Sequence, residues 1–209
     1  MALRRLELDA EALKALAHPL RVQILRVLEQ RDRASVTSLA TELGETTAAV
    51  SYHLRQLARH GVVEQVPTDD PAEDDGAAGP RPVGRRQRWW RMAVDELHMD
   101  AVALTRAPDT REAFGFLARE AVAERARRLA HWFATATDWP QDWQRAATEM
   151  EVLLTLDASQ TRALADDLKA LVDRYRALPP GKGARRVDVQ YAVFAADLPA
   201  EPAEPAEPS

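Results

Sequence analysis

The chain has 209 residues, of which 46% are hydrophobic and 29% are charged, and this length allows one or two globular domains. The absence of cysteine excludes disulfides, thiolate metal ligands and cysteine nucleophiles, and the net charge of -5 excludes a polybasic coating protein. No apolar run approaches the ~18 residues of a membrane span. The N-terminal residues lack an apolar stretch, so we expect no signal peptide and a cytoplasmic protein.

The first two predicted helices follow capping signals. Asp9 can accept hydrogen bonds from the free N–H groups at the start of a helix that ends near Ala17. Pro19 suits the first position of a second helix, because the N–H that proline lacks would have no helical partner there. Apolar residues recur at helical spacing along this second segment, namely Leu20, Ile24, Val27 and Leu28.

The next two predicted helices are separated by a short turn. One covers about residues 38–43, with Thr37 as its N-cap, and ends at Gly44. The other runs from Thr46 to about His60. Two helices joined by such a glycine-containing turn predict a helix-turn-helix, although any compact corner of two helices has the same outline.

Two strand-like segments, residues 62–66 and 86–92, enclose a Pro/Gly-rich stretch. Both are rich in β-branched or aromatic residues. Residues 67–80 carry five acidic and no basic residues, whereas residues 81–91 carry five arginines and no acid. The pattern predicts a hairpin with a long exposed loop at 67–84 and a basic base.

The second half of the chain has a different pattern. Residues 111 to about 137 predict a long helix, and Asp157 opens another that is flanked by alternating apolar segments at 150–156 and 187–194. This order predicts a β-α-β unit. Two strands alone are marginal, so we expect the sheet to be completed across a subunit or against another element. The Ala-Glu-Pro repeats at 197–209 predict a disordered tail.

The fourth predicted helix carries the clearest functional pattern. Val50, Leu54 and Leu57 fall on one face, and burying them turns the opposite face outward. That face combines hydroxyls, a phenol and a guanidinium, which can meet base edges and phosphates in a major groove about 12 Å wide. The N-terminus of the helix, with its free N–H groups, favours a phosphate. The candidate DNA-binding residues are Thr46, Thr47, Ser51, Tyr52 and Arg55.

Three blocks of this region resemble ArsR-type winged-helix transcriptional regulators. They are residues 13–25, 39–44 and 50–63, and their order and spacing match the family pattern. The resemblance covers about residues 8–98. It implies a winged helix-turn-helix, a homodimer and a palindromic operator in double-stranded DNA, with the fourth helix as the recognition helix. Thr47, Ser51, Tyr52 and Arg55 inherit the base-reading role by their position in the motif.

The resemblance also gives the basic hairpin a role. Inside a winged helix, the base of the wing would lie against the DNA backbone beside the groove. We therefore expect phosphate contacts from Arg85, Arg86 and Arg88. The alternative is a solvated hairpin whose arginines balance the acidic residues of the loop.

Metal sensing is not expected. Sensors of this family commonly bind metal through a Cys-x-Cys cluster on the third helix or a His/Asp set on the dimer helix. Residues 41–44 read Thr-Glu-Leu-Gly at the first place, and His98-Met99-Asp100 is the only hint of the second. Without three or four convergent ligands we expect no metal and no other cofactor. Enzyme motifs such as a Gly-rich phosphate loop are also missing, so no catalytic residues are expected.

The expected fold is mainly α with a small β content. A winged helix-turn-helix domain at 1–98 precedes a helical dimerisation region with a C-terminal β-α-β unit at 99–196. We interpret the protein as a sequence-specific DNA-binding regulator, a dimeric repressor with room for an unidentified small-molecule effector near its aromatic residues. The alternative is a winged-helix protein-interaction module that does not bind DNA specifically. The aromatic residues in question are Trp132, Trp139, Trp143, Tyr175 and Tyr191.

Overall fold

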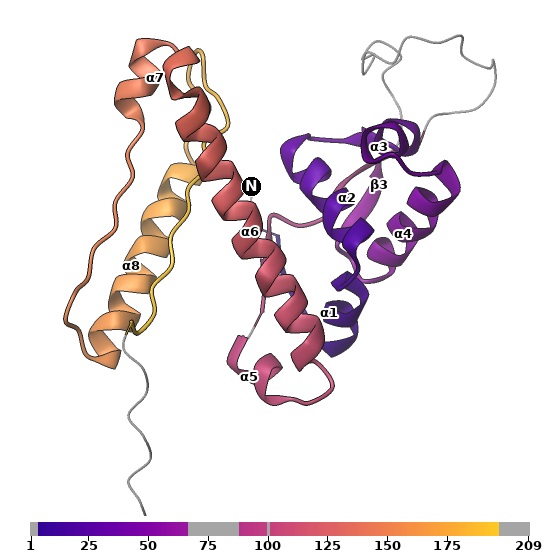
Figure 1. The fold of residues 1–209 in the computed structure, drawn as a ribbon, viewed down its shortest axis with the longest axis horizontal. Coiled ribbons are helices and arrows are strands. Elements are labelled where there is room, and N and C mark those ends of the chain that lie inside the picture. The colour runs from indigo at the N-terminus through magenta and orange to yellow at the C-terminus, as the bar shows by residue number, and fades with distance from the viewer. Residues whose placement is uncertain (1–3, 67–87, 100, 197–209) are drawn as a thin grey trace, which may run out of the picture. The chain divides into compact units, whose positions relative to one another are not determined.

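The computed structural model describes residues 4–66, 88–99 and 101–196 (Figure 1). The predicted wing loop and the predicted tail lie outside the described residues. The chain divides into two compact units, the first ending at Arg128 and the second beginning at Leu129. Within the described ranges, no helix is long and apolar enough to cross a membrane.

The N-terminal unit begins with four helices. They are α1 (Ala10–Leu16), α2 (Pro19–Gln30), α3 (Val36–Leu43) and α4 (Thr47–Arg59). The predictions of α1, α2 and α4 are confirmed together with their capping signals. The side chain of Asp9 accepts a hydrogen bond from the backbone N–H of Ala12 at 2.8 Å, and Pro19 is the first residue of α2. These signals fix where the helices start.

Helix α3 begins earlier than predicted, and its N-cap is Ser35 rather than Thr37. The Ser35 hydroxyl accepts a hydrogen bond from the Ser38 backbone at 3.0 Å, and the Ser38 hydroxyl accepts one from the Ser35 backbone at 3.0 Å. This reciprocal capping satisfies two N–H groups at once. It also brings Val36 into the helix, where it packs against the core.

A three-stranded antiparallel sheet completes the domain. Its strands are β2 (Ala34–Ser35), β4 (Trp89–Met92) and β3 (Val63–Val66), in that spatial order. The predicted pairing of the two segments beside the wing loop is confirmed by β3 and β4, in which Val66 lies opposite Trp89. A second, two-stranded parallel sheet joins β1 (Arg5–Glu7) to β5 (Glu96–His98). It was not predicted, because strands of three residues are too short to show an alternating pattern.

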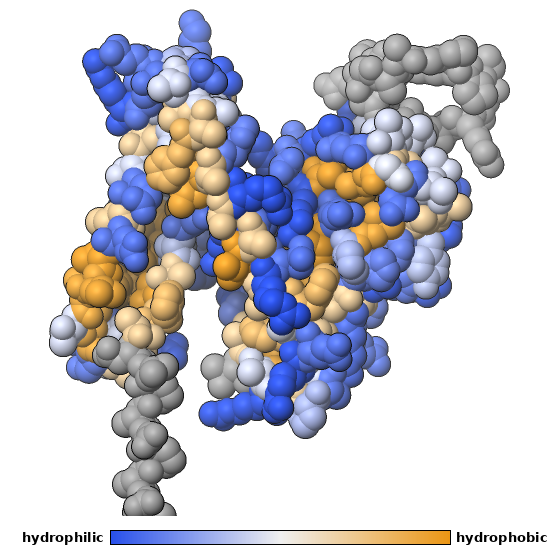
Figure 2. All heavy atoms as spheres, viewed as in Figure 1, coloured by the Kyte–Doolittle hydropathy of each residue, from blue (hydrophilic) through white to orange (hydrophobic). Residues whose placement is uncertain are grey.

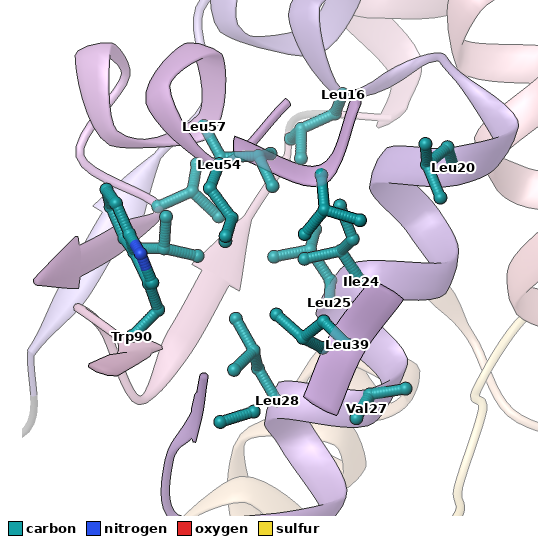
Figure 3. Close-up of a cluster of buried hydrophobic side chains, with 14 of the residues drawn as sticks. Leu16, Leu20, Ile24, Leu25, Val27, Leu28, Leu39, Leu54, Leu57 and Trp90 are labelled. Carbon is teal, nitrogen blue, oxygen red and sulfur yellow. The ribbon is translucent and has the colours of Figure 1, made fainter. Parts of the chain in front are cut away.

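The hydrophobic core lies where the helices meet the sheet (Figure 3). Ile24 of α2, Leu39 of α3 and Leu54 of α4 are fully buried there. Trp90 of β4 packs on the same cluster. Large apolar side chains from three helices therefore lock the helix-turn-helix to its sheet, since each contributes about 1.5–3 kcal/mol when removed from water.

Two further helices follow the winged domain. They are α5 (Ala101–Arg106) and α6 (Arg111–Thr135), and the second confirms the predicted long helix. The first part of α6 belongs to the N-terminal unit. Leu117 packs against the core, and the Glu120 carboxylate forms an ion pair with the Arg26 guanidinium of α2 at 2.8 Å. The last residues of α6 belong to the C-terminal unit.

The C-terminal unit contains α7 (Gln141–Ala146) and α8 (Ala158–Arg176). The predicted cap of α8 is confirmed, since the Asp157 side chain accepts a hydrogen bond from the Gln160 backbone at 2.8 Å. Within the single chain the predicted strands at 150–156 and 187–194 are not formed, because both segments are extended but neither pairs in a sheet, and completion of a sheet across a subunit stays a prediction. An alternating apolar pattern indicates which side chains favour burial. A strand also needs an adjacent strand that pairs with its backbone N–H and C=O groups.

Candidate nucleic-acid interface

The turn before α4 sets the direction of that helix. Gly44 adopts the left-handed conformation with φ of 67°, and nothing but Gly44, Glu45 and Thr46 separates α3 from α4. The backbone N–H of Glu45 donates to the carbonyl of Ala40 at 2.9 Å and so closes the end of α3. A glycine at this position costs no Cβ strain.

Helix α4 presents one apolar and one polar face, as predicted. Val50 and Leu54 are 0% exposed and Leu57 is 1% exposed, so the inner face is sealed against the core. On the other face Thr47 and Arg55 are exposed, and half of the Tyr52 side chain is accessible. Ser51 is half-buried at the edge of this outer face. The structure therefore brings four of the predicted residues to one side of α4.

Thr46 lies at the start of α4 and is also exposed. Its hydroxyl accepts a hydrogen bond from the backbone N–H of Ala49 at 3.1 Å, so it acts as the N-cap. The N–H groups of Thr47 and Ala48 have no partner within the helix by the geometry of a helix terminus. These N–H groups, rather than the Thr46 side chain alone, make this end of α4 suited to an anion such as phosphate.

Arg59 is a further candidate on α4 that was not predicted as a site residue from the sequence. It is exposed, and four residues after Arg55 it lies on the same side of the helix. The spacing of four residues between the two arginines was the sequence signal that could have identified Arg59. Among the residues that the structure describes, Arg55 and Arg59 have no ion-pair partner, so both charges are available to a ligand.

His53 faces inward from α4 and is almost fully buried. Burial lowers the pKa of this imidazole below its usual 6.5, and the neighbouring His18 and Arg21 lower it further, while Glu45 opposes them. The ring packs against the ring of His18 with a centroid distance of 4.4 Å. His53 is therefore a structural residue that joins α4 to the start of α2.

The base of the wing is described only from Arg88 onward. Arg88 is exposed immediately before β4, whereas Arg85 and Arg86 lie outside the described residues. Arg91 differs from Arg88, because its guanidinium pairs with the Glu64 carboxylate at 2.8 Å. Burial raises the pKa of Glu64, but hydrogen bonds and charge from Arg91 and Arg4 outweigh it and hold that pKa low. Of the two arginines, Arg91 is therefore the one whose charge is offset by a carboxylate.

The C-terminal unit holds a cavity of about 350 Å³. Trp132, Phe133 and Gln144 contribute to its lining, and its volume is at the lower end of known ligand pockets. Of the five aromatic residues expected around an effector, Trp132 lines this cavity, whereas Trp139, Trp143, Tyr175 and Tyr191 do not. In the described ranges, no three His, Asp or Glu side chains are grouped closely enough to hold a metal ion.

Comparison with known proteins finds similarity in the same region of the chain. Residues 16–66 match the family model of a helix-turn-helix domain. Two curated relatives, both uncharacterized HTH-type transcriptional regulators of Mycobacterium tuberculosis, from strains CDC 1551 / Oshkosh and ATCC 25618 / H37Rv, are 42% identical over 57 residues. The match covers 27% of this chain, and the chain spans about half the length of these curated relatives.

Solved structures with a similar arrangement include a homodimeric winged helix-turn-helix DNA-binding domain of Mycobacterium bovis, described as a possible ArsR-family regulator. It is 24% identical, covers 57% of this chain and 82% of its own, and has a TM-score of 0.31. A possible transcriptional regulator for arsenical resistance is 21% identical, covers 66% and 97%, and has a TM-score of 0.28. At TM-scores this low, the likeness supports no inference about this chain.

The geometry and the matched family model together define the N-terminal domain as a helix-turn-helix with a wing. The order of its helices and strands is the one that the resemblance of its sequence blocks to ArsR-type regulators implies.

Proposed function

We propose that the protein is a sequence-specific DNA-binding transcriptional regulator that inserts α4 into the major groove. One observation carries the proposal. The apolar face of α4 is buried in the core, while Thr47, Tyr52 and Arg55 are exposed on its other face. Hydroxyl, phenol and guanidinium groups on an exposed helix of this length can donate and accept hydrogen bonds at base edges.

Two positive contributions beside α4 support contact with the DNA backbone. The helix N-terminus at Thr47 offers free N–H groups to a phosphate, and Arg88 stands exposed at the base of the wing. A protein of net charge -5 needs such local positive groups, because its overall field repels a polyanion. Placing the positive groups around one helix gives the attraction a defined orientation.

The assembled form in this proposal is a homodimer on a palindromic operator, acting as a repressor in the cytoplasm. Two copies related by a two-fold axis present two α4 helices, and a palindrome repeats the half-site with the same symmetry. An unidentified small molecule in the cavity beside Trp132 is the proposed effector. It would regulate binding by favouring one dimer geometry over the other.

Selection of binding sequences from random double-stranded DNA, followed by fluorescence anisotropy at two salt concentrations, tests the proposal. We expect a selected site that binds on the order of 10³-fold more tightly than scrambled DNA. Arg55→Ala should weaken binding to that site by more than about 1 kcal/mol, because it removes a base contact. Arg162→Ala, which removes another exposed arginine, from α8, should leave binding unchanged.

Weak binding of equal strength to selected and scrambled DNA would contradict the proposal. The winged helix would then be a protein-interaction module, and α4 would be tested against protein partners instead. Equal losses for Arg55→Ala and Arg162→Ala would also overturn it, because attraction would then depend on charge alone.

A further inference from the structure

The C-terminal unit lacks a core of its own. From residue 129 to residue 196, all of which the structure describes, no side chain is buried. In Figure 2 apolar side chains are uncovered along this unit. A folded unit of this length normally buries a cluster of apolar residues, as the N-terminal unit does. We therefore expect the apolar surface around its amphipathic helix α8 to be covered by a component outside this single chain.

The exposed apolar residues are concentrated in the two extended segments beside α8. In 150–156, Met150 is 81% exposed and Leu153 is 82% exposed. In 187–194, Phe194 is 75% exposed and Val187 is 67% exposed. Nine large apolar residues in the two segments leave on the order of 1,000 Å² of side-chain surface accessible in each chain. Monomers rarely expose an apolar patch above a few hundred Å².

Both segments have the pattern of strands but are not paired with each other in the chain. Apolar residues alternate in each, and the two segments run in the same direction, opposite to α8 (Figure 1). An extended segment outside a sheet is a template for pairing with another chain. The missing component is therefore further strands and an apolar layer, rather than a small ligand.

We propose that residues 150–156 and 187–194 of one chain form a β-sheet with the same segments of a second copy, and that this shared sheet supplies the core of the C-terminal unit. The area agrees with such an interface, since each partner in a stable complex of standard size contributes about 800 Å².

Charge favours a second copy over a different protein. Glu149 and Glu151 flank Met150 at the start of the first segment, while Lys182 and Arg185 precede the second, which itself carries one acid, Asp188. The first segment of one chain thus suits the second segment of another. A two-fold axis makes both pairings at once, because each copy offers acidic residues at the start of one segment and basic residues just before the other. A foreign partner would have to carry both features itself.

The absence of cysteine allows a direct test in the full-length chain. Thr155→Cys is placed in the first segment, and Gln190→Cys, Ala192→Cys or Phe194→Cys in the second, each in a separately tagged chain. Paired strands lie about 4.8 Å apart, within reach of a disulfide, and the three positions sample neighbouring registers. After mixing and mild oxidation, we expect a two-chain disulfide in at least one mixture. Ser159→Cys, exposed at the start of α8, is the matched control for Thr155→Cys.

Two results would overturn the shared sheet. One is that no mixture yields more two-chain product than the Ser159→Cys control. The other is that Thr155→Cys with Ala192→Cys in one chain closes a disulfide within that chain and gives no two-chain product. The inference rests on the homodimer of the proposed function and not on DNA binding. Sedimentation equilibrium of the unmodified chain separates the cases: a dimer that lacks these disulfides refutes only the sheet, whereas a monomer refutes the homodimer as well.

Discussion

Arg21 of α2 donates a hydrogen bond from Nε to Nδ1 of His53 on α4 over 3.2 Å. The same guanidinium donates to the backbone carbonyl of Ala15 at the end of α1. Because a guanidinium has no acceptor, Nδ1 of His53 must be unprotonated in this arrangement. The neutral form of one imidazole thus joins the candidate recognition helix to α2 and, through Arg21, to α1.

Acidification should therefore destabilise the domain through His53. Burial lowers the pKa of His53 in the folded state, so below about pH 6.5 the unfolded chain binds more protons than the folded one. The contribution is fully present above the unfolded pKa and is lost as the pH falls. Chemical denaturation between about pH 7.5 and 5 should show a falling free energy of unfolding, with a shallower fall in His53→Gln. His131→Gln, which changes an exposed histidine, should keep the wild-type slope, and an unchanged slope in His53→Gln would refute this assignment.

The two arginines at the wing should differ in their effect on DNA binding. Arg88 is exposed, whereas the charge of Arg91 is offset by Glu64 at 2.8 Å. Arg88→Ala should reduce the slope of log Kobs against log salt by about 1, as expected for one lost phosphate contact. Arg91→Ala is the matched control and should reduce it less. Fluorescence anisotropy across a salt series measures both slopes. Equal reductions would show that the ion pair with Glu64 does not weaken the contact of Arg91 with phosphate.

The helices of the winged domain could be predicted because each is specified locally. Asp9, Pro19 and Thr46 are start signals that act within one turn, and the apolar spacing of α4 determines which face is buried. The outward position of Tyr52 and Arg55 follows from that spacing alone. The start of α3 was missed because Ser35 and Thr37 are both good caps, and the choice depends on how Val36 packs in three dimensions.

What the sequence did not reveal depends on contacts between distant residues. The buried position of both Trp89 and Trp90 is an example, because strict alternation would place them on opposite faces with only one in the core. Trp89 is covered by the guanidinium of Arg33, 5.0 Å from its ring. Likewise, the strand pattern of 150–156 specifies which side chains favour burial but not which chain provides the neighbouring strand.

A cluster around Glu124 should stabilise the junction between α2 and α6. Its carboxylate is buried and lies 3.3 Å from Nε of Arg26 and 3.3 Å from Nε of Arg128, and it also pairs with Arg127. Glu124→Gln keeps the shape but removes the charge, so we expect a loss of about 1–3 kcal/mol in the free energy of unfolding. Urea denaturation measures it, with Glu112→Gln at an exposed position as control. A loss no larger than that of the control would mean that the cluster is solvated and contributes little.

The turn between α3 and α4 should depend on its glycine. Gly44 has a φ of 67°, and a Cβ built there meets no atom within 4 Å, so the cost of Gly44→Ala is conformational rather than steric. We expect it to lower the free energy of unfolding by about 1 kcal/mol. Gly181→Ala is the matched control, because Gly181 also has open space around it but an ordinary φ, and it should cause little loss. Urea denaturation of the two variants gives the comparison, and an equally small effect at Gly44 would show that the turn can adopt a right-handed conformation without disturbing α4.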